Sequence, residues 1–522
     1  MKILQSRSSQ ILFLTTYWIL IAFILLLRAF SVGLSHDEYQ FVASGQIFAR
    51  YFLLPYRDYP FLHMPYLPFV NGVLFLFTGG ALLSARLINE IFFLASALLL
   101  FVLIQRNFGK SLSWAGIGAG SIAVGLMVFD PSFIDMDGRA LNHALPTFLG
   151  LLAFSFYLQT GSSPHALRWI AASGVAVGLA TGARLSFAVM AIPLLAALVL
   201  FPSEDLFKNR LIKGVVFSLG FLGGLLPAAF LFFLAPQQAY YGNLLYIRLN
   251  TIYRQQLDFT NAMSLRQKLG FFITTILETP NGFVEYLLFF SVLGAAALRL
   301  VRKRQPARLD LLVSASLAVA LLAAGFAPTP VWPQYFFAPI PFLLLVLFYG
   351  LQGWGSTLGW LGMAILVAVL LLGSAAPLGT LWQAIHHPQD WTTAKAALQA
   401  NALRAVVPSG QVLTLAPIVP LEAGLGAYPV FTNGPFSWRT APILAPEKRT
   451  LYGVIGPDEL EDYLAKDPPA AILTGPEQNY EGFTADDTLG LESPFTQYAQ
   501  FHGYRPQIFP CKLYTQCTLW LK

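Results

Sequence analysis

Residues 11–40 read ILFLTTYWILIAFILLLRAFSVGLSHDEYQ. The apolar run Ile11–Phe30 is long enough to cross the hydrocarbon core of a bilayer as a helix. It lacks the short core and small-residue cleavage site of a signal peptide, so we expect an uncleaved first span. Two adjacent acids, Asp37 and Glu38, follow close to the point where this helix leaves the bilayer. Ionised groups at that level are costly and are usually kept for binding or catalysis, so the stretch predicts a site at the membrane surface.

The whole chain has the composition of a polytopic membrane protein. Of its 522 residues, 56% are hydrophobic and only 11% are charged, which lies well outside the balance of soluble domains. The net charge of +6 comes from Lys and Arg residues scattered between apolar runs. That distribution excludes a basic patch for nucleic acid.

Apolar runs of about 17 to 25 residues predict transmembrane helices. We expect eleven, near residues 11–30, 83–105, 111–129, 140–158, 167–183, 185–201, 214–234, 283–301, 309–326, 335–352 and 355–377. The apolar stretch Pro65–Thr78 is short and rich in proline. We therefore expect it to lie on the outer surface as a juxtamembrane helix, within a first outer loop that covers residues 31–82.

The charges between the spans predict the orientation of the chain in the inner or plasma membrane. A cytoplasmic N-terminus satisfies the positive-inside rule, because the inner segments then carry Lys2, Arg7, Arg106, Lys110, Arg168, Lys208, Arg210, Lys213, Arg302, Lys303, Arg304 and Arg308. The acids that fall outside are Asp37, Glu38, Asp58, Asp130, Asp135, Asp137 and Asp258.

A second domain is expected after the spans. Residues 1–377 form the transmembrane domain, and residues 378–522 have a mixed polar composition that predicts a small extracytoplasmic α/β domain. Helices are expected at Asp390–Leu403 and Pro457–Ala465, and strands at Val412–Leu415 and Ala470–Leu473. No GxGxxG or P-loop motif occurs in this domain, so nucleotide binding is unsupported. It holds both cysteines of the chain, Cys511 and Cys517, either as a disulfide or as two thiols.

The first outer loop carries the most informative chemistry. Asp37 to Arg50 has helical spacing and predicts an interfacial helix that presents its acidic end. A general base at Asp37, with Arg57 or His63 beside a phosphate, would suit glycosyl transfer from a phospholipid-linked sugar. The alternative interpretation is that the acidic pair only caps the helix.

The order of motifs in this loop resembles the GT-C membrane glycosyltransferases. The resemblance is strongest to the branch that contains the protein O-mannosyltransferases and the aminoarabinose transferases of lipid A, and it extends over about Ile11–Pro377. It rests on an acidic pair after the first span, the turn Pro55–Asp58, the segment His63–Pro65, and an apolar stretch that ends in Thr78–Gly80 and Ser84–Leu87.

The resemblance implies a base at Asp37, a cleft formed by juxtamembrane helices, and a polyprenyl-phosphate sugar as donor, which needs no nucleotide site. Glu38 would shape the site or help to hold a divalent metal ion, Mg or Mn, although members of the wider class differ in needing one. A second acid is common near the fourth span, and Asp137 or Asp135 is the candidate because Asn142 stands where that acid often lies.

Further candidates line the predicted outer face. Arg57, His63 and Arg184 would bind the donor phosphate, although Arg184 could also be a snorkelling residue at a helix end. The predicted substrate contacts are Tyr39, Asp58, Asn142, His143, Tyr246, Arg248 and Tyr335. An aromatic belt at the membrane interface is the alternative explanation for the tyrosines.

These features predict a membrane glycosyltransferase that moves a sugar to a lipid, glycan or protein acceptor at the outer face. One alternative is a polyprenyl-lipid transporter or flippase. The two halves of the chain lack an internal repeat, and the acids gather at the outer edge, which disfavours that alternative. The other is a non-catalytic membrane scaffold that carries an outer binding domain.

Overall fold

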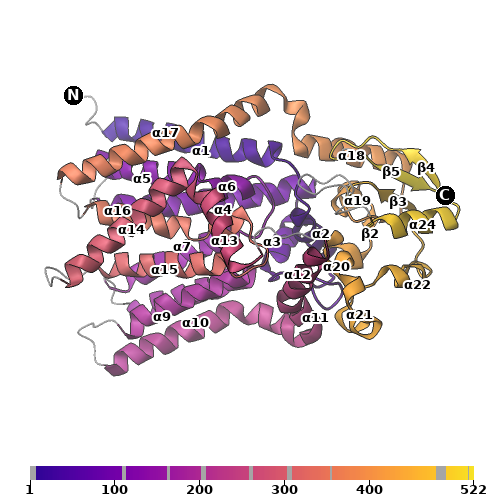
Figure 1. The fold of residues 1–522 in the computed structure, drawn as a ribbon, viewed down its shortest axis with the longest axis horizontal. Coiled ribbons are helices and arrows are strands. Elements are labelled where there is room, and N and C mark those ends of the chain that lie inside the picture. The colour runs from indigo at the N-terminus through magenta and orange to yellow at the C-terminus, as the bar shows by residue number, and fades with distance from the viewer. Residues whose placement is uncertain are drawn as a thin grey trace.

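The computed structural model describes residues 7–108, 113–161, 165–200, 207–257, 263–301, 308–352, 356–477, 490–514 and 516–522. A bundle of long helices forms one end of an elongated molecule, and a small sheet with short helices forms the other (Figure 1). The N-terminus lies at the far end of the bundle and the C-terminus in the sheet region.

Each predicted span coincides with a helix of the bundle. Seven helical segments of the described residues are long and apolar enough to cross a membrane: α1 (Arg7–Ser31), α4 (Ala81–Asn107), α8 (Ala166–Ala183), α10 (Phe207–Leu234), α14 (Pro280–Val301), α16 (Ile340–Gln352) with the turn before it, and α17 (Ser356–His386). The shorter ones are α5 (Trp114–Val128), α7 (Ala144–Gln159), η2 (Leu185–Met190) continued by α9 (Ala191–Val199), and α15 (Leu309–Gly325). The chain is therefore a multi-pass membrane protein, and the number of helices that cross remains a prediction.

The first outer loop forms the two expected helices, α2 (Asp37–Tyr51) and α3 (Tyr66–Phe75). They pack closely, because a Cβ added at Gly45 would lie only 2.8 Å from the Asn71 Cβ. The remaining short elements of the bundle are α6 (Pro131–Met136), α11 (Pro236–Tyr240), η3 (Tyr241–Leu245), α12 (Tyr246–Gln256), α13 (Leu265–Phe272), η4 (Ile273–Leu277) and η5 (Pro333–Phe336).

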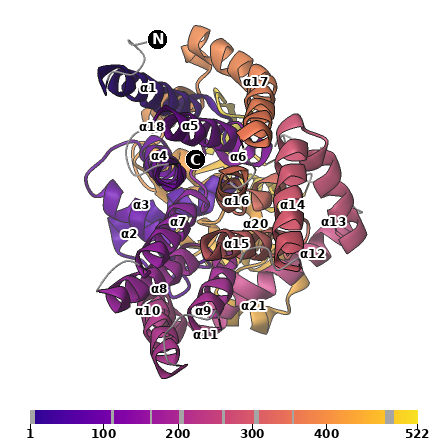
Figure 2. The same ribbon diagram turned by 90° about the vertical axis from the view of Figure 1, so that its left-hand side faces the viewer.

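Glycines let α8 and α10 meet backbone to backbone. A Cβ at Gly174 or Gly178 of α8 would lie 2.2 Å from a carbonyl oxygen of α10, and one at Gly224 of α10 would lie 2.3 Å from the Val175 oxygen. Such small-residue contacts are a common way for helices to associate in lipid, where apolar burial gives little drive. Figure 2 shows α8 and α10 side by side at one edge of the bundle, with α1 and α17 at the opposite edge.

The C-terminal region contains a mixed five-stranded sheet of order β2-β1-β3-β5-β4. Its strands are β1 (Gln411–Leu413), β2 (Gly426–Ala427), β3 (Ala471–Thr474), β4 (Arg505–Ile508) and β5 (Thr518–Leu521), and β1 is parallel to both β2 and β3. The helices are η6 (Pro388–Asp390), α18 (Thr392–Val406), α19 (Ile418–Glu422), η7 (Pro429–Phe431), α20 (Pro435–Thr440), η8 (Ala441–Ile443), α21 (Pro446–Tyr452), η9 (Pro457–Glu459), α22 (Leu460–Leu464) and α24 (Ser493–Phe501). The predicted α/β class is thereby confirmed.

The predicted details of this region agree closely with the elements. The strands expected at 412–415 and 470–473 are β1 and β3, and the expected helices are α18 and η9 with α22. Cys511 and Cys517 form a disulfide, with their Cα atoms 5.5 Å apart. The domain boundary expected at residue 377 falls inside α17, which continues to His386, and the domain division remains a prediction.

Helix α2 connects the two ends of the molecule. The Arg50 guanidinium donates to the carbonyl oxygens of Leu425, at 2.9 Å, and Leu421, at 2.7 Å. The first outer loop and the C-terminal region are therefore packed together. Some residues used above to predict orientation lie outside the described part of the chain: Lys2, Lys110, Asp258, Arg302, Lys303 and Arg304.

Candidate active site

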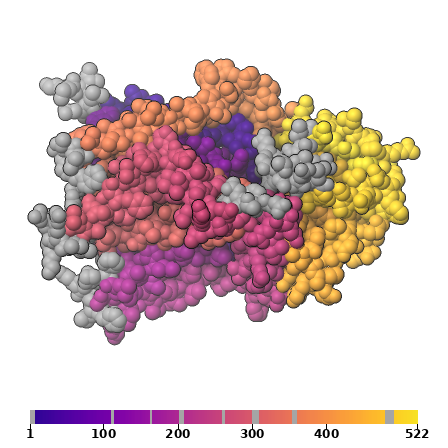
Figure 3. Space-filling model, in the orientation of Figure 1, coloured from indigo at the N-terminus to yellow at the C-terminus, as the bar shows by residue number. Residues whose placement is uncertain are grey.

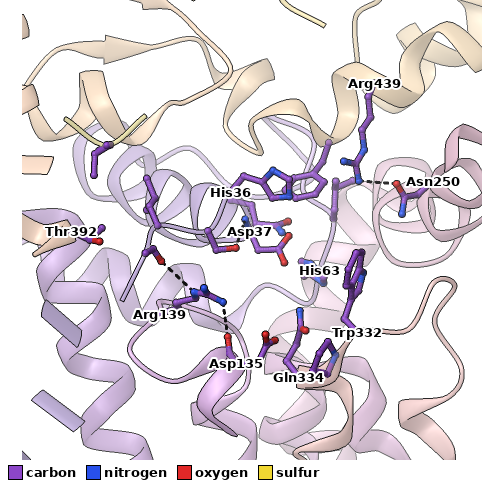
Figure 4. A pocket seen from close by; sticks show the side chains of 18 of the residues that line it. His36, Asp37, His63, Asp135, Arg139, Asn250, Trp332, Gln334, Thr392 and Arg439 are labelled. Carbon is purple, nitrogen blue, oxygen red and sulfur yellow. Dashed lines mark hydrogen bonds between the residues drawn. The ribbon is translucent and has the colours of Figure 1, made fainter. Parts of the chain in front are cut away.

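A cavity of about 540 Å³ lies where the helical bundle meets the C-terminal region. Its walls come from the α1–α2 turn, α2, α12, η5, α18, α20 and the loop before Cys517. Figure 4 shows Asp37 near the centre of this space. The charged and histidine side chains that line it are His36, Asp37, His63, Asp135, Arg139, Arg254, Lys395, Arg439 and Lys512. Cations therefore outnumber carboxylates, and the cavity suits an anionic ligand.

The two acids of the first outer loop have different environments. Asp37 is the first residue of α2 and lines the cavity. Glu38 is fully buried and lies away from it, because Arg86 on α4 binds both of its oxygens at 2.8 Å. The backbone N–H groups of Ser35 and Ala140 donate to the same carboxylate, at 3.0 and 2.8 Å. Asp37 is thus available to a ligand, whereas Glu38 fixes the α1–α2 turn.

Glu38 does not fit as a ligand for a divalent metal. Both of its oxygens already accept hydrogen bonds, as described above. Within the described ranges, no group of three or more His, Cys, Asp and Glu side chains gathers as metal ligands would. We therefore derive no chemical step through a metal ion.

Four of the predicted residues, among them His63, gather around a fifth, Arg184, which follows α8. Its Nη1 donates to the Asn142 Oδ1 at 2.6 Å and lies 3.1 Å from the His143 Nε2. Its guanidinium carbon lies 5.3 Å from the ring centroid of Tyr335. Tyr335 and His63 line the cavity, whereas Arg184, Asn142 and His143 are not among its lining residues.

Burial keeps the two histidines of the cavity uncharged. It lowers the pKa of His63 to about 3, and the positive charge of Arg184 acts in the same direction. Burial likewise lowers the pKa of His36 to about 3; Asp37 opposes this shift, and Arg439 and Arg254 reinforce it. At neutral pH both imidazoles are therefore hydrogen-bonding groups without charge.

Arg57 and Asp58 lie outside the cavity. Arg57 is exposed, and its Nε donates to the Asp58 Oδ1 at 2.9 Å. Asp58 also accepts from the Leu54 backbone N–H at 2.7 Å, which closes the turn. This turn holds Tyr56 in the left-handed conformation, with a φ of 67°. Asp58 and Arg57 thus stabilise the conformation of this loop.

Three further predicted residues are not among those that line the cavity. Tyr39 is buried, and its hydroxyl lies 2.7 Å from that of Tyr514. Asp137 is buried against Arg28, with a 2.7 Å ion pair. Arg248 lies on the exposed side of α12. Tyr246, two residues earlier, does line the cavity.

Several cavity residues were missed by sequence reasoning. Arg139, Arg254, Lys395, Arg439 and Lys512 all line it. Asp135, which the sequence offered as the alternative to Asp137, lines it as well. Arg254 belongs to a segment in which tyrosines already suggested a site. No local sequence motif indicates that the other four cations belong to the site.

A second cavity, of about 490 Å³, shares Gly33 with the first. It runs between the ends of α1 and α17 and beside α6. Its lining combines apolar side chains such as Val32, Ile134, Leu381 and Trp391 with polar ones, among them Arg28 and Asp390. Figure 3 shows a hollow between the orange α17 and the pink helices, with indigo and purple N-terminal segments at its base.

Solved structures share this fold. ArnT from Cupriavidus metallidurans bound to undecaprenyl phosphate matches with a TM-score of 0.63 and 13% identity, over 99% of this chain and 98% of that chain. Its apo state matches with a TM-score of 0.61 and 14% identity over the same shares. The apo oligosaccharyltransferase of Archaeoglobus fulgidus matches with a TM-score of 0.51 and 12% identity, over 89% of this chain and 70% of that chain.

These likenesses establish the fold. Both neighbours are GT-C proteins, so the chain has the GT-C fold that its first outer loop predicted. No protein-family model and no curated protein matches the sequence.

Proposed function

We propose that this chain, which has the GT-C fold, transfers one sugar from a polyprenyl-phosphate donor to a hydroxyl or amine acceptor at the outer face of the membrane. One observation carries the proposal: the carboxylate of Asp37 lines a cavity that is otherwise rich in cations and that shares Gly33 with a second, partly apolar cavity. A base, cations for a phosphate and a route for a lipid tail are the parts that the reaction needs.

Asp37 acts as the general base. The acceptor oxygen or nitrogen attacks the anomeric carbon of the sugar, and Asp37 takes the proton that the acceptor loses. The bond between the anomeric carbon and the phosphate oxygen breaks, and its electron pair leaves with the polyprenyl phosphate. Asp135, which lines the same cavity, is the second acid that we assign to the site in place of Asp137.

Cations on the membrane side of the cavity stabilise the phosphate as it leaves. Arg139 lines the cavity, and Arg184 lies near Tyr335 and His63, which also line it. His63 is uncharged at neutral pH, because burial lowers its pKa to about 3. It therefore contributes a hydrogen bond, and Arg139 and Arg184 supply the charge. Arg57 has no part in this proposal, since it is exposed and pairs with its neighbour Asp58.

The partly apolar cavity beside α1 and α17 holds the isoprenoid tail of the donor. ArnT, which shares the fold, was solved with undecaprenyl phosphate bound, and this supports a polyprenyl phosphate as the carrier. We further propose a cytoplasmic N-terminus and an extracytoplasmic C-terminal region. The two lie at opposite ends of the bundle. Basic residues such as Arg106, Arg168 and Lys213 lie near the ends of α4, α8 and α10, at alternate connections between the helices, as the positive-inside rule requires.

The test is sugar transfer by the purified full-length protein in detergent, with synthetic polyprenyl-phosphate sugars and a panel of acceptors. Asp37→Asn should lower turnover by about 10²- to 10⁴-fold, the usual contribution of a general base, while donor binding is retained. Asp467→Asn is the matched control, because Asp467 is exposed and far along the chain in the C-terminal region. Unchanged turnover in Asp37→Asn would refute the assignment of the base. Donor binding without turnover across the panel would favour a flippase or a scaffold.

A further inference from the structure

Arg439, on α20, is a buried cation in the C-terminal wall of the cavity. It is 7% exposed and lines the cavity. Its Nη2 donates to the Asn250 Oδ1 at 2.7 Å and to the Tyr246 hydroxyl at 3.1 Å. Its guanidinium carbon lies 4.7 Å from the ring centroid of Phe436. These contacts fix the guanidinium in place, and every one of them is with an uncharged group.

In the part of the chain that the structure describes, no carboxylate forms an ion pair with Arg439. A buried cation is costly unless an anion accompanies it. Glu477 is close enough to feel its charge, but burial raises the pKa of Glu477 to about 8, which keeps that carboxyl largely protonated at neutral pH. An anion from outside the protein is the partner that would compensate Arg439.

Arg254 adds a second buried guanidinium to the same part of the cavity. It lies one helical turn after Asn250 on α12, is 4% exposed, and lines the cavity. Both guanidinia act on His36, whose pKa they help to lower. His36 is consequently uncharged, and Figure 4 shows it between Arg439 and Asp37. The two arginines form a cationic wall, in which Arg439 is held by the neutral groups of Asn250, Tyr246 and Phe436.

This wall is separate from the cations assigned to the donor phosphate. In Figure 4, Arg439 lies on the side of the C-terminal region, whereas Arg139, Asp135 and His63 lie on the side of the bundle, with Asp37 between the two groups. A polyprenyl-phosphate sugar brings a single phosphate to the cavity. The second cationic wall therefore faces the part of the space where the acceptor must approach Asp37.

We propose that Arg439 and Arg254 bind an anionic group of the acceptor, a phosphate or a carboxylate, beside the hydroxyl or amine that Asp37 deprotonates. The proposal rests on the proposed transferase, because only a transferase has an acceptor. It makes the acceptor an anionic molecule and the C-terminal region part of its binding site.

The first experiment measures binding of ³²P-labelled inorganic phosphate to the full-length protein in detergent, saturated with undecaprenyl phosphate. The wild type should bind phosphate under these conditions, and Arg439→Gln should weaken that binding about tenfold or more, as expected for charge-assisted hydrogen bonds. Arg57→Gln is the matched control and should bind as the wild type does. Arg439→Lys keeps the charge but loses the planar guanidinium with its paired N–H donors, so it should bind phosphate with intermediate affinity. This variant replaces Arg439→Gln in the test if Arg439→Gln does not elute as a folded monodisperse protein.

Three results would overturn the proposal. The first is phosphate binding by Arg439→Gln that equals that of the wild type. The second is the absence of phosphate binding by the wild type once undecaprenyl phosphate is present. The third comes from comparing undecaprenyl phosphate with undecaprenyl diphosphate: if Arg439→Gln weakens binding of the diphosphate only, the arginine binds a second phosphate of the donor. Neither readout needs turnover, so a failure of sugar transfer across the panel would be distinguishable from a failure of the anion subsite.

Discussion

The Glu38 carboxylate and the Arg86 guanidinium form a fully buried pair, joined by two hydrogen bonds of 2.8 Å. The same guanidinium donates to the carbonyl oxygens of Ala29 and Val32, at 3.1 and 2.8 Å, so it also holds the end of α1. The turn between α1 and α2 is thereby fixed from both sides. Asp37, one residue before Glu38, owes its position at the cavity to this pair.

The first prediction concerns this pair. Glu38→Gln should lower the free energy of unfolding by about 3–5 kcal/mol, because it leaves the Arg86 charge buried without a partner. Thermal unfolding of the purified protein in detergent measures the loss. The double variant Glu38→Leu/Arg86→Met removes both charges and should recover most of the stability. A Glu38→Gln protein as stable as the wild type, with turnover lost, would instead make Glu38 a catalytic residue.

The second prediction separates two arginines that the sequence made equivalent. Arg184→Gln should weaken binding of undecaprenyl phosphate about tenfold, the effect of losing a charge-assisted contact, because Arg184 belongs to the cluster with His63 and Tyr335. Arg57→Gln should bind as the wild type does, because Arg57 is exposed and contacts Asp58. Competition of unlabelled lipid against a labelled polyprenyl phosphate gives both affinities. Equal losses in the two variants would contradict the placement of the phosphate.

Local patterns were sufficient to predict most of the fold. The apolar runs predicted the helices of the bundle, and the helical spacing after Asp37 predicted α2, because both depend on neighbouring residues. The buried strand at Val412–Leu415 was predicted for the same reason, and β1 overlaps it. The mixed strand order of the sheet could not be predicted from local patterns, since β5 pairs with β3 across more than forty residues of intervening chain.

The site was only partly predictable, because its halves are distant in sequence. Asp37 and His63 were found from motifs in one loop. Arg439 follows them by several hundred residues and reaches the cavity only through the packing of the C-terminal region on the bundle. Glu38 was grouped with Asp37 because the two are adjacent, and its partner Arg86 lies 48 residues further along the chain. Adjacent acids can thus have different partners, which spacing alone does not reveal.

The third prediction is a pH dependence of stability that arises from Glu492. Burial raises the pKa of this carboxyl to about 8, against 4.5 for the free group. The folded state therefore binds its proton more tightly, and the stabilisation, complete below pH 4.5, is lost as the pH rises through 8. Glu492→Gln stays uncharged and can keep the hydrogen bond from the Gly475 N–H. Its melting temperature should therefore rise relative to that of the wild type between pH 5 and pH 9.

Glu447→Gln is the control for this pH series. Glu447 is exposed, so the melting temperature of the Glu447→Gln protein should follow that of the wild type at every pH. A Glu492→Gln protein whose melting temperature also runs parallel to the wild type would mean that Glu492 titrates normally in the folded protein.

The fourth prediction tests the close packing of α8 on α10. A Cβ at Gly178 would lie 2.2 Å from the Phe221 carbonyl oxygen, a contact with backbone that no side-chain rotation can relieve. Gly178→Ala should therefore force the helices apart and lower the free energy of unfolding by about 1–3 kcal/mol, as overpacking does. Gly223→Ala on α10 is the matched control, because a Cβ there meets nothing within 4 Å. The control should be as stable as the wild type or gain up to about 1 kcal/mol from helix propensity. Unfolding in detergent followed by tryptophan fluorescence compares the two, and equal stability of the variants would show that α8 and α10 are not in backbone contact in the membrane protein.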